Sequence, residues 1–240
     1  MAEIIGARAD AGRIEDHVRR SLRAALARGG DIATAAQNRL APAVTSIDAA
    51  AALAKTTEEA EATAWAALTA EDAKADSGIG AVRDAMWNAL GRPRTSPLMD
   101  QVFPGGVSTY TSGDPRGQPI LMQILRSRIL AASAPQWTQP LREGWAAEID
   151  ALLAPYTAAV EAHRPIEASS TVAAAGLRAA IRTAQARLSA FKRDLLSLGL
   201  TQSQIHEIIP DASAGSGTSG ASPGNGAGAT PASPAGGASA

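Results

Sequence analysis

The sequence contains no cysteine and few aromatic residues, and both absences restrict what the protein can be. Without cysteine there are no disulfide bonds, no thiolate nucleophile and no cysteine-ligated zinc or iron–sulfur site. Aromatic residues make up 3% of the 240 residues, whereas hydrophobic residues make up 45%, much of it alanine. Because a buried alanine removes little surface from water, we expect a core that depends on close approach of helices.

Charge of one sign and long apolar runs are also missing. The formal net charge is −1, and such a balance gives no general attraction to nucleic acid or to an anionic membrane. No apolar run approaches the roughly 20 residues that a bilayer-spanning helix needs, and residues 1–8 hold no apolar stretch of signal-peptide length. We therefore expect no membrane association and a cytoplasmic location.

What the sequence does contain is helical periodicity over most of its length up to residue 209. An apolar stripe at every fourth position predicts a helix over 11–28, ended by two glycines. Pro42 should kink or restart the next helix, which continues to residue 76, although a capping box at 56–59 makes a break there conceivable. Ser77 is expected to cap a separate, shorter helix that ends near Gly91.

The second half of the chain repeats this pattern. Pro119 suits the first turn of a helix with Leu121, Ile124, Leu125 and Ile129 facing inward. Another helix should begin at 138–140 and bend at Pro155.

The last long helix has the strictest spacing in the chain, at alternating intervals of four and three residues. Its apolar positions are Leu177, Ile181, Ala184, Leu188, Phe191, Leu195 and Leu198. This heptad seam is typical of a coiled coil and can be filled within one chain or by a second copy. Gly199 then predicts a Schellman stop, and Thr201 with Gln204 predicts a capping box for a short final helix.

These elements predict an all-α fold. We expect an elongated helical bundle of about six or seven helices, with an irregular central loop and a disordered C-terminal tail. The bundle should span residues 9–210, with its loop at 92–118. Residues 1–8 should form a flexible N-terminus, and residues 211–240, rich in Ala, Gly, Ser and Pro, should be disordered because they cannot bury enough apolar surface.

Residues 103–119 stand out because glycine, proline and two aromatics interrupt the helical background. Structured loops on rigid helical frames often carry function. Asp114 to Gly117 fits a type I turn, and Tyr110 combines a large ring with a hydrogen-bonding hydroxyl. A ligand or partner site would use Tyr110, Asp114 and Arg116. The alternative, which we favour, is that the loop packs against the bundle and redirects the chain.

The sequence offers no coherent catalytic set. His17, His163 and His206 fall on different predicted helices, and the Glu-x-x-His pattern of di-iron bundles is absent. The glycines of the loop follow no strand and precede no Gly-Lys-Ser/Thr motif. We therefore predict no catalytic residue, no metal site and no cofactor.

Three hypotheses for function follow. The first is a non-enzymatic helical interaction or scaffold protein that contacts a protein partner or a second copy through its helices. The second is a small-ligand binder or enzyme with its site at 103–119. The third, nucleic-acid binding through arginine-rich helices at residues 19–23 and 178–193, is weaker, because pairing with the acidic segment 58–76 explains these arginines more simply.

Overall fold

The computed structural model describes residues 11–210, which form eight helices and no strand. The helices are α1 (Ala11–Arg28), α2 (Gly30–Arg39), α3 (Ala41–Ala89), α4 (Pro97–Val102), α5 (Ser108–Thr111), α6 (Gln118–Ala131), α7 (Gln139–Ser197) and α8 (Gln202–Ile208). The predicted all-α, elongated bundle is confirmed. The central loop is more ordered than predicted, since α4 and α5 lie within it. The predicted flexible N-terminus at 1–8 and disordered tail at 211–240 fall outside the described residues.

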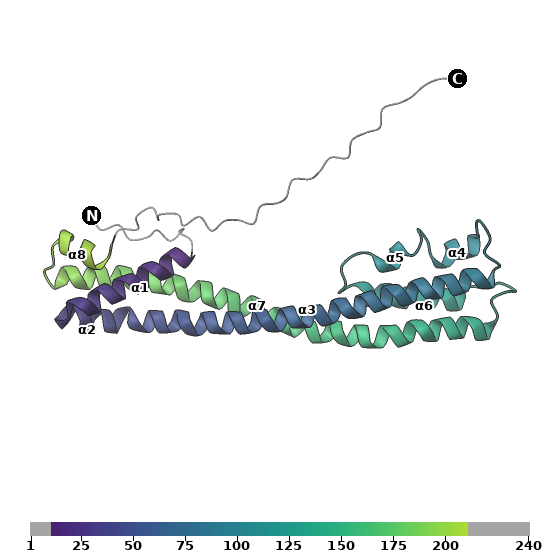
Figure 1. Ribbon diagram of the computed structural model, residues 1–240, viewed down its shortest axis with the longest axis horizontal. Helices are drawn as coiled ribbons and strands as arrows, with labels where there is room; N and C mark the ends of the chain where they lie inside the picture. The colour runs from purple at the N-terminus through teal and green to yellow at the C-terminus, as the bar shows by residue number, and fades with distance from the viewer. Residues whose placement is uncertain (1–10, 211–240) are drawn as a thin grey trace, which may run out of the picture.

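Two long helices set the shape of the molecule. α3 has 49 residues and α7 has 59, and at 1.5 Å per residue they are about 75 and 90 Å long. They lie side by side and antiparallel along the whole molecule (Figure 1). Ile47, early in α3, therefore shares a core with Ile181, late in α7, whereas Met86, late in α3, shares one with Trp145, early in α7.

Both long helices run through positions where the sequence predicts a break or bend. α3 is continuous through 56–59 and through Ser77, whose hydroxyl donates to the carbonyl of Ala73 (2.9 Å) instead of capping a new helix. α7 is a single helix with Pro155 inside it. The next residue, Tyr156, is fully buried against the neighbouring helices, and such packing offsets the hydrogen bond that a proline removes. The predicted separate helices are therefore wrong.

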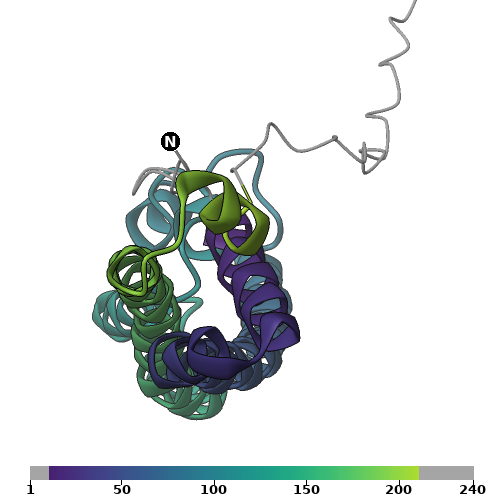
Figure 2. The same cartoon turned by 90° about the vertical axis from the view of Figure 1, so that its left-hand side faces the viewer.

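We call the antiparallel pair of α3 and α7 the hairpin. One end of it, the proximal end, is built from the first and last parts of the described chain. Figure 2 shows α1, α2 and α8 grouped around the ends of α3 and α7. The heptad positions from Ile181 to Leu195 are buried in this core together with Ile14, Val18 and Ile47. The seam is thus filled within one chain, apart from Leu198 at its end, which is exposed.

The opposite, distal end has a second core, formed by the end of α3, the start of α7 and α4 to α6. Met122, Leu125 and Ile129 face this core from α6. Ile124, which we expected to face inward, is 40% exposed. α6 is apolar on nearly every side, so periodicity alone cannot identify its buried face.

Between the two cores the molecule narrows to α3 and α7 alone (Figure 1). We call residues 48–64 of α3 and 168–180 of α7 the waist. Ala173 is the one buried residue among them. The waist therefore lacks a core of large side chains. Among residues 11–210, no helix combines the length and apolar character needed to cross a bilayer.

Candidate functional site

The predicted loop folds over the distal end of the hairpin. Within it, the Gly117 N–H donates to the Asp114 carbonyl (2.9 Å), which confirms the turn at 114–117. The Asp114 side chain accepts from the Arg116 N–H (3.1 Å) and holds the turn in place. In the segment before this turn, Phe103 and Tyr110 are buried, whereas most of the residues between and after them are exposed.

Tyr110 is part of the distal core and is only 1% exposed. Its hydroxyl donates to the carbonyl of Val102 (2.8 Å) and accepts from the Arg128 guanidinium (2.6 Å). Its ring meets Phe103 edge-on, with 5.7 Å between ring centres. Both polar and apolar parts of this side chain are therefore used inside the protein, as the packing interpretation expects.

Asp114 and Arg116 lie at the surface, apart from Tyr110. Arg116 approaches Asp114 (3.7 Å), pairs with Glu167 of α7 (2.7 Å) and lies 5.2 Å over the Trp65 ring of α3. These contacts tie the turn to both long helices. The structure thus separates the three candidate residues into a buried one and two exposed ones, and ligand binding by Asp114 and Arg116 stays a prediction.

A polar network lies beneath the turn. The Tyr156 hydroxyl donates to Asp72 (2.5 Å) and is 2.9 Å from the Pro115 carbonyl. Burial and the neighbouring Asp72 carboxylate raise the pKa of Tyr156 well above its usual value, so the phenol stays protonated. Burial, together with the charge of Asp72, also raises the pKa of Asp76. The network anchors the turn to the hairpin.

The three histidines lie on three helices, with His17 in α1, His163 in α7 and His206 in α8. Nowhere in residues 11–210 do three or more metal-ligating side chains come together as a metal site would require. His163 is buried beside Trp65, with 5.4 Å between ring centres, and no hydrogen bond is made by its Nε2.

The arginine-rich helices do not face the acidic segment 58–76. That segment lies beside the middle of α7, where Asp72 meets Tyr156, because the long helices are antiparallel. Arg19 instead pairs with Glu15 of its own helix (2.8 Å) and with Asp48 of α3, which lies outside the acidic segment. The predicted pairing of the arginine-rich helices with the acidic segment 58–76 is therefore wrong.

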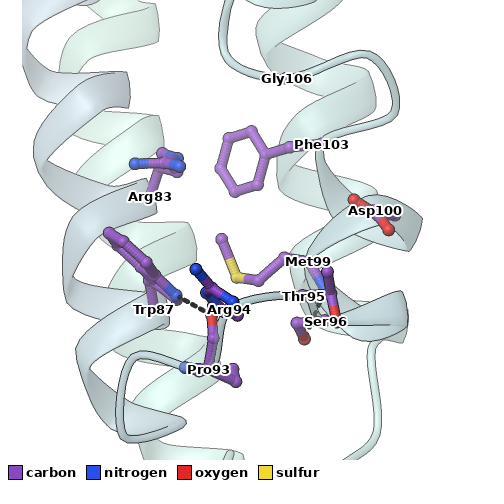
Figure 3. Close-up of a pocket in the computed structure, with 10 residues that line it drawn as sticks. All are labelled: Arg83, Trp87, Pro93, Arg94, Thr95, Ser96, Met99, Asp100, Phe103 and Gly106. Carbon is purple, nitrogen blue, oxygen red and sulfur yellow. Dashed lines mark hydrogen bonds between the residues drawn. The ribbon is translucent and has the colours of Figure 1, made fainter. Parts of the chain in front are cut away.

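Two surface features were not recognised in the sequence. The first is a cleft of about 240 Å³ at the distal tip, between the end of α3 and the segment 93–106 (Figure 3). Arg83, Trp87 and Arg94 line it. The signal that could have indicated it is a tryptophan with arginines near it in sequence, four residues before a Gly-Arg-Pro turn.

The second feature is a shallow groove of about 610 Å³ on the waist. We call its lining the waist face: Ala50, Leu53 and Thr57 from α3, and Ala168, Ser169, Val172, Ala173 and Gly176 from α7. None of these residues is charged. Leu53 and Val172 project from it with 57% and 70% of their surfaces exposed.

Comparison of the chain with protein-family models, with curated proteins and with solved structures gives no match in any of the three.

Proposed function

We propose that the protein is a non-enzymatic helical interaction protein that associates with a second copy of itself through the waist face. The observation that supports this proposal is a stretch of two bare helices with exposed apolar side chains between two well-packed ends. Helices in water gain most of their stability from burying an apolar face, and here that face has little to bury it.

The side chains of the waist face suit close packing of helices. Leu53 and Val172 can act as projecting knobs, while Ala50, Ala168 and Gly176 leave shallow positions beside them. In a two-fold interface the same patch of each copy meets that of the other. The large, projecting side chains of one copy can then fit over the small residues of the other, and the reverse. The face has both kinds of residue and is therefore compatible with itself.

Charge also favours a second copy over an oppositely charged partner. The waist face has no charged residue, in a chain where 19% of residues are charged. A like-charged face would repel its own copy, and a charged partner would find no counter-charge here. An uncharged face causes no such repulsion between two copies and therefore suits self-association.

The size of the face sets the expected strength. The waist face covers about 12 Å of each helix, at residues 50–57 and 168–176, and the whole waist covers about 25 Å. The two helices of the waist, each about 10 Å in diameter, therefore present about 500 Å² per copy, about half of it the waist face. A dimer would bury about 1,000 Å² in total, at the lower limit for a specific interface. We therefore expect a weak, concentration-dependent dimer.

Sedimentation equilibrium of the full chain tests this proposal. Wild type should change from monomer to dimer as its concentration rises from about 1 to about 500 μM. The double variant Leu53→Lys, Val172→Lys should remain monomeric, because each dimer would bury four unpaired ammonium groups. Both positions are exposed and helical, so lysine should leave the monomer folded.

Leu141→Lys is the matched control, since Leu141 is 43% exposed near the start of α7 and lies outside the waist. This variant should dimerise like wild type. A wild-type protein that stays monomeric throughout the range, or a double variant that dimerises as well as the control, would rule out self-association through this face.

A further inference from the structure

The cleft at the distal tip is built by an unusual end to α3. The Arg92 N–H donates to the Trp87 carbonyl (3.1 Å), and the Gly91 N–H donates to the Asn88 carbonyl (2.9 Å), which together form a Schellman motif. Gly91 and Arg92 both have positive φ, 78° and 56°. Two successive left-handed residues reverse the chain, so Pro93 and the residues after it return along α3.

The returning chain fixes one wall of the cleft. The indole N–H of Trp87 donates to the Pro93 carbonyl (3.0 Å), as Figure 3 shows. With its polar group satisfied, Trp87 presents its ring system to neighbouring cations. The Arg83 guanidinium lies 5.1 Å from the ring centre and that of Arg92 lies 5.9 Å from it. These cation–π contacts hold both guanidinium groups beside the cleft.

Two guanidinium groups of the cleft keep hydrogen-bonding capacity for a ligand. Arg83 pairs with its sequence neighbour Asp84 (2.9 Å) in an exposed ion pair, and such pairs contribute little. Arg94 projects from the returning chain toward Trp87 and Met99 (Figure 3). Within residues 11–210, Arg94 has no ion pair. Guanidinium groups bind carboxylate and phosphate oxygens in pairs, so an oxyanion is the matching ligand group.

The wall opposite the arginines carries apolar side chains beside the polar Thr95 and Ser96. Met99 and Phe103 come from α4 and its end, and both face the cleft opposite Trp87 (Figure 3). Asp100, the one acidic lining residue, stands on the wall away from the two arginines. The cleft therefore offers an anion-binding side and an apolar side. Its volume of about 240 Å³ is below that of sites for drug-sized molecules, and suits a ligand of roughly ten heavy atoms.

We propose that this cleft binds a small organic anion, in which a carboxylate or phosphate group contacts Arg83 and Arg94 and an apolar stem packs against Met99 and Phe103. The binding site is independent of the waist face, because it lies at the distal tip. It also differs from the predicted site at 103–119, of which only the first residues contribute.

The proposal is tested by titrating the full chain with benzoate, phenyl phosphate and inorganic phosphate. Binding is monitored by two-dimensional NMR of the indole N–H signals. The four tryptophans give four signals, and the Trp87→Phe variant assigns that of Trp87. Benzoate or phenyl phosphate should shift the Trp87 signal in a saturable way and leave the other three unchanged. Whichever of these two anions binds more tightly shows whether the cleft prefers a carboxylate or a phosphate group.

Inorganic phosphate should bind at least about tenfold more weakly than phenyl phosphate, because it lacks the apolar stem. Arg83→Gln and Arg94→Gln should each lower the affinity for the more tightly bound aromatic anion by about tenfold, since each removes a charge-assisted hydrogen bond. Arg178→Gln, an exposed arginine in the proximal half of α7, is the control and should leave the affinity unchanged.

Three results would overturn the proposal. The first is the absence of a saturable Trp87 shift with either aromatic anion. The second is equal affinity for inorganic phosphate, which would show adventitious charge attraction only. The third is an affinity that is unchanged in both the Arg83→Gln and the Arg94→Gln variants, or that falls as much in the Arg178→Gln control as in these variants.

Discussion

Removal of the Tyr110 hydroxyl should destabilise the distal end, although the substitution Tyr110→Phe keeps the buried ring. The hydroxyl makes two bonds, to the Val102 carbonyl at 2.8 Å and from Arg128 at 2.6 Å, and the residue is 1% exposed. In the phenylalanine variant the carbonyl of Val102 loses its donor, and water cannot replace it without opening the core. Arg128 is partly exposed and can turn to solvent.

The magnitude follows from these two bonds. A typical hydrogen bond contributes about 1 kcal/mol net, and a buried acceptor left without a donor costs about 1–3 kcal/mol. Because the arginine can recover its hydration, we expect a total loss of about 2 kcal/mol. For a protein of about 200 ordered residues, this corresponds to a fall in melting temperature of roughly 4–8 °C.

Urea denaturation followed by tryptophan fluorescence is the suitable assay. All four tryptophans lie between residues 65 and 145, so their emission reports on the distal half. The control is Thr109→Val, which removes the neighbouring, exposed hydroxyl that donates to Pro104 (2.6 Å) and should cost less than about 0.5 kcal/mol. If Tyr110→Phe unfolds at the same urea concentration as this control, the reasoning about a buried, doubly bonded hydroxyl is refuted.

Further predictions concern α3. Gly78→Ala should destabilise by about 1–3 kcal/mol in thermal unfolding, because its Cβ would lie 2.3 Å from Leu152 Cδ1. Gly80→Ala, with no atom within 4 Å of the new Cβ, should instead stabilise by up to about 1 kcal/mol, and a loss there would contradict the helix-propensity argument. Burial and Asp72 raise the pKa of Asp76, so its protonated form favours folding and this contribution is lost as pH rises through the raised pKa. Asp76→Asn should therefore be more stable than wild type in urea at pH 7, and the difference should shrink toward pH 4; a constant difference would exclude this titration.

Local signals at the end of α7 predicted the local structure correctly. At the end of α7, the Leu200 N–H donates to the Leu195 carbonyl (3.3 Å) and Gly199 has a φ of 81°, as a Schellman motif requires. Thr201 and Gln204 form both bonds of the predicted capping box. Each of these features depends on residues within one or two helical turns, so neighbouring residue types are sufficient to predict it.

Features that depend on distant residues could not be predicted in the same way. How a helix continues through Pro155 depends on what Tyr156 packs against, and the hydrogen-bond partner of Tyr156, Asp72, is far away in the sequence. Tyr110 looked suitable for recognition because no local pattern shows that Arg128 meets its hydroxyl. The cleft beside Trp87 was missed for the same reason, since Arg94 approaches it only after the chain reverses.

The two cores differ in chain connectivity, and this has a consequence for folding. The distal core uses one continuous stretch, residues 68–160, whereas the proximal core joins residues 14–47 to residues 177–209. The proximal core must therefore close a loop that contains the entire distal unit, at a greater entropy cost while that unit is unfolded. Once the distal unit has folded, the antiparallel start of α7 directs the rest of that helix back along α3. We therefore expect folding to proceed from the middle of the chain outward, with the waist helices pairing before the two ends of the sequence meet.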